Sequence, residues 1–396
     1  MTAALPLAAL AALAVATAIL LERSGRAGYG WVAGSEFALI GVAMGPVGLD
    51  AISADLLEAV RPAELLAVAW LGLRFGLRVR PRALAGIAWR TRLASLFEPL
   101  VCLIVIRALL EGVIRSGVVD LDGPSAWAIA AVGSATTKAT AAWARARLGA
   151  KGGVSDALEA VSTLDDAVLL GAVALLVPRI APAPGLPAFI WAPAAATIVL
   201  GVGLGLVVTL LLGRGPFRGD LGWIALFGTC ALATGLSASL GLAAVAVAAL
   251  TGWIVGIASP HAEALEELTR TTERPAVLTL LLLGGASLTA GWTALALGSA
   301  AAVLRVLAKL FSGWVASPLL PVASRRGDLG TGLLGAGGMA FGVALPMAHI
   351  LPASGADLLL SSAVAMALLG DFLGTPLLRA LLSRAGEMAV QAEPAP

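Results

Sequence analysis

Charge is scarce in this sequence. Only 13% of its 396 residues are Asp, Glu, Lys or Arg, whereas 59% are hydrophobic. A soluble chain of this length needs far more charge to cover its surface, so the composition excludes an ordinary soluble protein and indicates one surrounded by lipid. The formal net charge of +2 indicates neither a nucleic-acid partner nor an acidic substrate.

Cysteine and histidine are also scarce, with two residues of each. Cys102 and Cys230 lie in apolar runs, and neither has a Cys or His at ligand spacing, which predicts packing residues and not metal ligands or a disulfide. His261 and His349 are equally isolated. We therefore expect no resident metal centre and no other cofactor.

Long apolar runs dominate what is present. A helix needs about 20 apolar residues to cross the hydrocarbon core of a membrane. The first run, 5–21, has no Lys or Arg before it, which favours a retained span over a secretory signal. The connections are short, and we expect no soluble domain. The thirteen predicted spans are 5–21, 31–49, 63–76, 83–110, 125–146, 156–177, 190–212, 220–239, 241–258, 275–290, 292–320, 329–350 and 356–383.

The basic residues predict how these spans are oriented. Arginines concentrate in alternate loops, while the intervening loops are acidic, with Asp50, Asp120 and Asp357 among them. Loops rich in Lys and Arg remain in the cytoplasm. This pattern predicts an N-terminus outside and a C-terminus in the cytoplasm, and we expect the membrane to be a bacterial inner membrane.

Four ionisable residues fall where lipid should exclude charge. Lys138 and Lys309 are two of only three lysines, and both lie within predicted spans, as do Asp165 and Asp166. Ionisable groups at membrane depth are costly and usually mark function. Two adjacent carboxylates cannot both be ionised cheaply, so a proton and a metal cation would compete for the same oxygens. The alternative is a buried ion pair that only holds helices together.

Two predicted spans are interrupted by small and polar residues. The span 125–146 contains Gly133-Ser-Ala-Thr-Thr-Lys-Ala-Thr, and the span 329–350 contains Gly335-Ala-Gly-Gly-Met. Unwound backbone in a membrane occurs only where it lines a cavity or is buried in protein. Two such helices indicate an inverted-repeat transporter with its site where they cross. The alternative is close packing of regular helices through small residues.

These segments resemble the monovalent cation:proton antiporter family 2, which contains the Kef-type and sodium/proton exchangers. The resemblance extends along nearly the whole chain, and its most specific element is Leu164-Asp-Asp together with Lys309. The other matching segments are Gly41-Val-Ala-Met-Gly-Pro, Gly235-Leu-Ser-Ala-Ser-Leu-Gly-Leu with Leu250-Thr-Gly-Trp, Gly332-Leu-Leu-Gly-Ala-Gly-Gly-Met-Ala-Phe, and Thr375-Pro376.

The resemblance implies a role for each matching residue. Asp166 would bind the ion or proton, Asp165 would pair with Lys309, and Thr136, with Thr137 next to it, would lie beside the site. It also implies an all-α fold with two crossing discontinuous helices, in which core helices slide against dimerisation helices as an elevator in a homodimer. The corresponding ranges are 83–177 and 292–385 for the core, and 1–76 and 190–290 for the dimerisation helices.

The sequence departs from the family pattern at two positions. Glu36 is one residue early, so the family's role for that Glu is not transferred. Lys138 replaces a proline beside the site, and a fully ionised set of two Asp and two Lys is neutral, which weakens cation binding. Lys138 is then a tethered substitute for the cation, or an uncharged amine, or a side chain that points away.

Three more charged residues lie at or near membrane depth. Glu98 precedes Pro99 and is interpreted as part of a kink or as a partner of Arg90 or Arg92. Asp371 is interpreted as a partner of Arg305 or as part of a cytoplasmic funnel. A structural role remains open for both acids.

The sequence thus predicts a transporter and not an enzyme. It would exchange protons for a small monovalent cation, Na+ or K+, across a lipid bilayer. The alternative is an antiporter scaffold that has lost cation exchange and acts as a sensor, as a subunit of a complex, or as a carrier of an anionic or organic solute. A channel is less favoured, because paired carboxylates and a buried Lys suit occluded binding.

Overall fold

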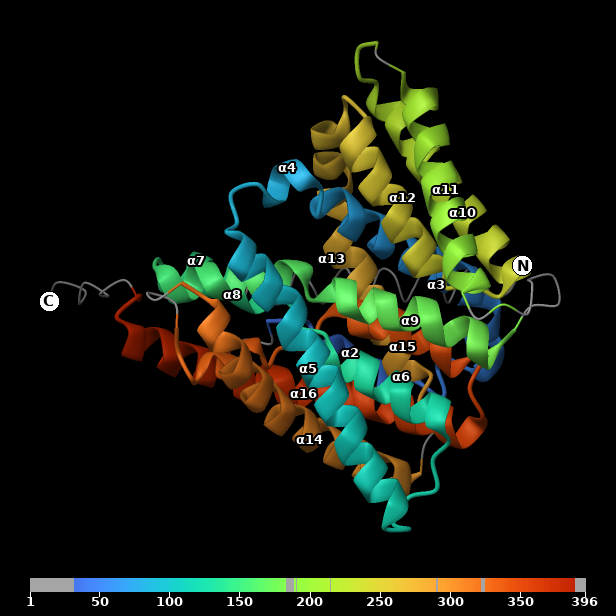
Figure 1. Ribbon diagram of the computed structural model, residues 1–396. Helices are drawn as coiled ribbons and strands as arrows, with labels where there is room; N and C mark the ends of the chain where they lie inside the picture. Colours follow the sequence, from blue (N-terminus) through green and yellow to red (C-terminus); the bar gives the residue numbers. More distant parts are fainter. Residues whose placement is uncertain are drawn as a thin grey trace, which may run out of the picture.

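The structure is a computed structural model that describes residues 32–182, 189, 191–213, 215–289, 291–321 and 325–388. Within these ranges every regular element is a helix (Figure 1). The predicted span 5–21 lies outside the described residues. The helices are α2 (Glu36–Met44), α3 (Ala54–Arg78), α4 (Pro81–Leu84), α5 (Trp89–Arg115), α6 (Gly123–Ser134), α7 (Lys138–Leu148), α8 (Gly153–Leu164), α9 (Asp166–Ile180), α10 (Ala192–Leu212), α11 (Gly219–Leu240), α12 (Ala244–Ala258), α13 (Ala262–Ala286), α14 (Trp292–Ala316), η2 (Ser317–Leu319), η4 (Leu329–Leu333), α15 (Gly338–Ala348) and α16 (Ala353–Ala385).

The predicted spans correspond to these helices, and the chain is a multi-pass membrane protein. Each predicted span after the first contains a helix, or a pair of helices separated by a short break. In the described part of the chain, six helices are long and apolar enough to cross a membrane by themselves. They are Trp89–Arg115, Gly153–Ile180, Ala192–Leu212, Gly219–Leu240, Thr293–Leu319 and Ala353–Ala385.

Some helix ends differ from the predicted bounds. Helix α13 begins at Ala262, well before the predicted 275, because its first half is rich in Ala, Glu and Leu. These residues favour a helix but are too polar to be recognised as a membrane span. Helix α3 begins at Ala54, where the Ser53 hydroxyl accepts a hydrogen bond from the Leu56 backbone N–H (3.4 Å). Hydropathy detects the apolar part of a helix, whereas capping and propensity decide where it ends.

Glycines allow several helix backbones to approach closely. A Cβ atom added at Gly76 on α3 would lie 2.0 Å from the Ala249 carbonyl oxygen on α12, and one at Gly252 would lie 2.0 Å from that of Leu73. Gly285 similarly brings α13 against α2. Small residues at helix crossings are typical of membrane bundles. They make α3 with α12, and α2 with α13, two closely packed pairs.

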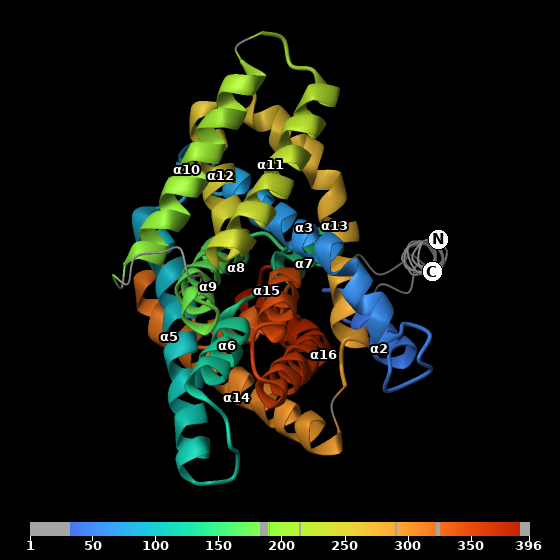
Figure 2. The same ribbon diagram turned by 90° about the vertical axis from the view of Figure 1, so that its right-hand side faces the viewer.

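The helices form two neighbouring groups in Figure 1. Helices α10, α11 and α12 lie together in the upper part, and α5, α6, α14 and α16 lie in the lower part. The turned view in Figure 2 shows the same separation, with α3 and α13 beside the first group. An apolar cluster joins α3 with α10, α11 and α12, and a larger one joins α5, α6, α9 and α14 to α16 and includes buried residues of α3 and α13.

Two helices are interrupted where they cross. The backbone is extended at 135–137, between α6 and α7, and irregular at 334–337, between η4 and α15. The Thr137 backbone N–H donates to the Gly335 carbonyl across the crossing (3.0 Å). A side chain at Gly335 would meet the Thr140 methyl group at 2.7 Å. The prediction of two crossing discontinuous helices is confirmed, and the breaks lie inside the protein as membrane backbone requires.

Candidate functional site

The two adjacent aspartates lie at the junction between α8 and α9, beside the crossing. Asp165 is completely buried. One of its carboxylate oxygens accepts a hydrogen bond from the Thr136 backbone N–H (2.6 Å), and the other accepts one from the Asp166 N–H (2.8 Å). Both oxygens of Asp165 are therefore occupied by backbone donors. Asp165 ties the first helix break to the start of α9.

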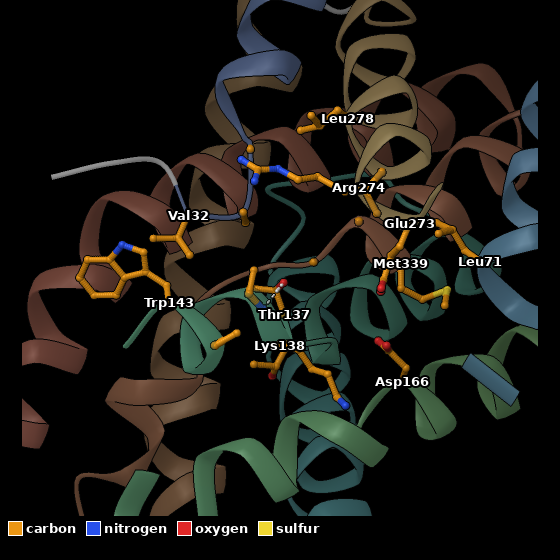
Figure 3. Close-up of a pocket in the computed structure, with 18 of the residues that line it drawn as sticks. Val32, Leu71, Thr137, Lys138, Trp143, Asp166, Glu273, Arg274, Leu278 and Met339 are labelled. Carbon is orange, nitrogen blue, oxygen red and sulfur yellow. Dashed lines mark hydrogen bonds between the residues drawn. The ribbon is translucent and has the colours of Figure 1, made fainter. Parts of the chain in front are cut away.

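Asp166 is placed differently, because its side chain lines a cavity of ≈ 1090 Å³ (Figure 3). Its Oδ2 atom lies 3.6 Å from the Arg78 guanidinium. Its Oδ1 atom is buried and has no hydrogen-bond partner among the described residues. An unpartnered buried carboxylate oxygen is costly unless a proton or a cation occupies it. Of the two aspartates, Asp166 is the one that lines the cavity and has an oxygen without a hydrogen-bond partner among the described residues.

Arg78 makes a contact with Asp166 that the sequence did not indicate. Arg78 ends α3 and reaches both Asp166 and Glu273 of α13, each at 3.6 Å. Glu273 also holds Arg74 at 2.5 Å. In the sequence, the only local signal for the role of Arg78 is its position at the end of an apolar span. Many other arginines share that position. The contact depends on how α3, α9 and α13 pack.

Lys309 forms its ion pair with Glu98 and not with Asp165. Its Nζ atom lies 3.2 Å from the Glu98 carboxylate and donates to the Ser134 carbonyl (2.7 Å) and the Thr136 hydroxyl (2.8 Å). The expected direct pair with Asp165 is replaced by a link through Thr136, whose N–H binds Asp165. The physical reason is that α5 faces α14 and brings Glu98 to the amine.

Glu98 is therefore the buried partner of Lys309 and not a partner of Arg90 or Arg92. It also accepts a hydrogen bond from the Ser312 hydroxyl (2.6 Å), so both of its oxygens are satisfied. Arg92 instead donates to the carbonyls of Ile87 and Ala85. Glu98 and Lys309 lie next to the first helix break, between α6 and α7.

Arg305 and Asp371 do not form the expected pair, because each binds backbone groups elsewhere. The Arg305 guanidinium donates to four carbonyls at the two helix breaks, those of Gly133 (2.9 Å), Ala135 (2.8 Å), Leu334 (2.5 Å) and Gly335 (3.3 Å). Asp371 on α16 accepts from the Ala33 N–H (3.0 Å) and the Ser35 hydroxyl (2.6 Å), just before α2. Arg305 joins the breaks, and Asp371 anchors α2.

Lys138 lines the same cavity as Asp166 (Figure 3). It is the first residue of α7, after Thr137, whose hydroxyl accepts from the Ala139 N–H (3.2 Å). Within the described ranges, Lys138 has no carboxylate within 4.0 Å. The predicted site residues Thr136, Thr137, Lys138 and Asp166 are thus brought to one cavity wall, but Arg78 makes the cationic contact with Asp166.

The charged lining of the cavity has more basic than acidic residues. The basic side chains are Arg74, Arg78, Lys138, Arg147, Arg270 and Arg274, and the acidic ones are Glu36, Asp166 and Glu273. With six basic and three acidic residues, the lining disfavours a free cation unless counter-ions or internal pairs reduce its positive charge. Glu36, whose role could not be transferred from the family pattern, lies in this wall.

This combination of crossing broken helices and membrane-buried carboxylates defines a protein with the fold of a sodium/proton antiporter. Among solved structures, the chain is similar to the sodium proton antiporter MjNhaP1 from Methanocaldococcus jannaschii at pH 8, with a TM-score of 0.69 and 16% identity over 98% of this chain and 97% of that one. A second MjNhaP1 structure, from electron microscopy, matches with a TM-score of 0.57 and 17% identity over 98% of each chain. No protein-family model and no curated protein sequence matches. The fold is shared, and the narrower resemblance to family 2 stays a prediction.

Proposed function

We propose that this protein exchanges protons for a small monovalent cation, Na+ or K+, and that Asp166 carries both in turn. The observation that carries the proposal is the Asp166 carboxylate, which is buried in a cavity wall with one oxygen unpartnered. A carboxylate in a low dielectric binds either a proton or a metal cation in place of the missing partner. Such competition for one group couples the two ions.

Asp165 has a supporting role in this proposal. Its two oxygens are occupied by the N–H groups of Thr136 and Asp166, so it orients the helix break and does not offer itself to the transported ion. Lys309, paired with Glu98, and the Arg305 guanidinium donate hydrogen bonds to backbone carbonyls of the same break. Asp166 thus faces the cavity from a rigid support, and a defined geometry is what selective ion binding requires.

We propose that exchange uses an elevator movement in a homodimer. Helices α5 to α9 and α14 to α16 would move as one body against α2, α3 and α10 to α13. The separation of the two groups in Figures 1 and 2 supports this division. Helices α10 and α11 also have exposed apolar residues, including Leu210, Leu211 and Ile224. Such a surface suits lipid or a second copy of the chain.

We propose that the chain lies in a bacterial inner membrane with its C-terminus in the cytoplasm, and contacts between loops support the placement of three predicted cytoplasmic segments on one side of the membrane. The segments at 151–155, 328 and 384–387, all predicted to be cytoplasmic, lie together. Glu387 accepts from the backbone N–H groups of Val154 (2.7 Å) and Ser155 (2.8 Å), and Arg384 lies 3.2 Å from Asp328. On this orientation, the cavity lined by Arg74 and Arg147 faces the cytoplasm.

Transport by purified protein in liposomes tests the proposal. A pH gradient across the vesicle is monitored with a fluorescent dye while Na+, K+ or Li+ is added outside. We expect Na+ or K+ to dissipate the gradient in native vesicles, and Asp166→Asn to abolish the response without unfolding the protein. Asp156→Asn is the matched control, because Asp156 lies on α8 but its exposed side chain pairs with Arg145. Exchange retained by Asp166→Asn contradicts the proposal.

The basic lining of the cavity favours one second candidate, a carrier of an anionic or organic solute. Six basic side chains around one cavity attract anions, and the α7 start adds a helix N-terminus to the wall. The same vesicles distinguish the two functions. No response to any cation, combined with uptake of a labelled small carboxylate or phosphate, would favour the anion carrier.

A further inference from the structure

Arg78 is shared between two carboxylates that lie on different helices. Its Nη2 atom is 3.6 Å from Asp166 Oδ2 on α9, and its Nη1 atom is 3.6 Å from Glu273 Oε1 on α13. The side chains of Arg78 and Asp166 are only 17% and 11% exposed, so water screens this contact weakly. Equal distances on both sides mean that the guanidinium is bound to neither carboxylate alone.

The contact with Asp166 is made from the same cavity that an incoming ion would use. Asp166 Oδ1 has no partner in the described structure, and Oδ2 has only the guanidinium at 3.6 Å, which is longer than a direct hydrogen bond. Lys138 lines the cavity but makes no ion pair there within the described residues. Arg78 is therefore the cation in contact with the carboxylate proposed to bind the ion.

Glu273 provides a second position for the same guanidinium. It already holds Arg74 at 2.5 Å, and Arg74 also donates to the Glu266 carbonyl and the Thr269 hydroxyl. The second carboxylate thus belongs to an ordered group of partners on α13. When a proton or a cation neutralises Asp166, the attraction on one side of Arg78 disappears and that of Glu273 remains.

We infer that Arg78 is a tethered counter-ion that neutralises Asp166 while the site is empty and is transferred to Glu273 when an ion or proton binds. The inference rests on the proposed function and assigns a specificity-determining role to a residue outside the aspartate pair. Arg78 competes directly with the transported cation, so it sets how tightly that cation binds.

The tethered arginine also couples loading to movement. Arg78 lies on α3 and Glu273 on α13, both in the proposed stationary group, whereas Asp166 lies on α9 in the proposed moving group. An ionised, empty Asp166 is held by Arg78 across the boundary between the groups. A loaded Asp166 is released from it. Because only the loaded carrier is free to move, the pair suppresses a futile return of the empty site.

The Na+ dependence of exchange in proteoliposomes tests this role through two changes with opposite expected signs. Arg78→Gln removes the competitor and is expected to lower the KM for Na+ roughly three- to tenfold, which lies toward the lower end of the couplings found between neighbouring residues. Glu273→Gln leaves Asp166 as the carboxylate that attracts Arg78, and it is therefore expected to raise the KM for Na+. Arg78→Lys retains the charge and is expected to restore most of the native KM.

The control and the contradicting result follow from the same measurement. Arg147→Gln removes another basic residue from the cavity wall, but Arg147 is exposed and far more strongly screened, so its KM is expected to change by less than about twofold. If Arg78→Gln and Glu273→Gln shift the KM in the same direction, or if neither shifts it, the inference is wrong.

A double-mutant cycle separates failure of this inference from failure of the proposed function. Thermal unfolding of purified native, Arg78→Gln, Asp166→Asn and doubly substituted protein needs no transport. We expect a coupling between the two positions in choline chloride that decreases in saturating Na+. Absence of coupling while native vesicles exchange Na+ overturns the role of Arg78 alone. Coupling that Na+ leaves unchanged, in a protein that exchanges no cation, overturns the ion-release step together with the proposed function.

Discussion

Lys309 and Glu98 form an ion pair of 3.2 Å in which both side chains are completely buried, although they are 211 residues apart in the chain. The pair lies next to the break between α6 and α7, where the Lys309 amine also donates to the Ser134 carbonyl and the Thr136 hydroxyl. Lys309 is thus connected to Asp165 through Thr136 and not by direct contact. This arrangement makes Glu98 part of the support of the site.

Removing one member of this pair should destabilise the protein strongly. Glu98→Gln leaves the Lys309 amine buried without its counter-charge, which costs about 3–5 kcal/mol for a buried pair. We expect a lower free energy of unfolding in detergent, measured by denaturant titration. The double change Glu98→Met with Lys309→Met should cost less than either single change. Asp220→Asn, at an exposed pair with Arg218, is the control and should have no measurable effect.

Arg305 should be required for the integrity of the crossing. It donates to carbonyls of both helix breaks, so Arg305→Met leaves several of them without donors at membrane depth. Each unsatisfied buried carbonyl costs about 1–3 kcal/mol, and we expect unfolding at a clearly lower temperature together with loss of exchange. Arg305→Lys, with fewer donors and no planar fork, should restore only part of the stability. A native melting temperature for Arg305→Met would contradict this role.

Thr136 should act through its hydroxyl and not through its shape. The hydroxyl accepts from the Lys309 amine at 2.8 Å, and a hydrogen bond to a charged group contributes about 1.5–3 kcal/mol. Thr136→Val keeps the shape and the backbone N–H that binds Asp165, but it removes this acceptor. We expect lower stability and slower exchange for Thr136→Val, and near-native values of both for Thr136→Ser. Equal behaviour of the two variants would contradict a role for the hydroxyl.

Gly370 should be intolerant of any side chain. A Cβ atom at this position on α16 would lie 2.6 Å from the Leu334 carbonyl oxygen and 3.0 Å from the Ala336 nitrogen, both in the second helix break. Gly370→Ala should displace the break from α16 and cost about 1–3 kcal/mol, as overpacking does. Gly171→Ala on α9 is a matched control, because nothing lies within 4 Å of its added Cβ. Unfolding temperatures of the two variants decide the prediction.

Much of the fold was predictable because its signals are local. The apolar runs are continuous stretches, several of them long enough to cross a membrane, and the two breaks are short runs of small or polar residues within such stretches. The aspartate pair was visible for the same reason, since both charges lie inside one apolar run. Helix ends were less predictable, because charged residues extend α13 outside its apolar part.

The partners within the site were much less predictable. The pairs Lys309–Glu98 and Arg78–Asp166, and the four carbonyls bound by Arg305, join residues that are far apart in the sequence. A charged residue at membrane depth needs a partner, but nothing local says which one. The expected pairs of Lys309 with Asp165 and of Asp371 with Arg305 were both plausible by charge, and the packing of α5, α14 and α2 selected others.

The sequence by itself determined that the chain is a helical membrane protein with two broken spans and a carboxylate pair within a third, because hydropathy and backbone breaks are properties of continuous segments. Only the tertiary structure decided that Asp165 is occupied by backbone donors while Asp166 faces the cavity. It also placed Arg78 against Asp166. The physical reason is that the burial of a carboxylate follows from the residue itself, whereas its counter-charge depends on which helices pack together.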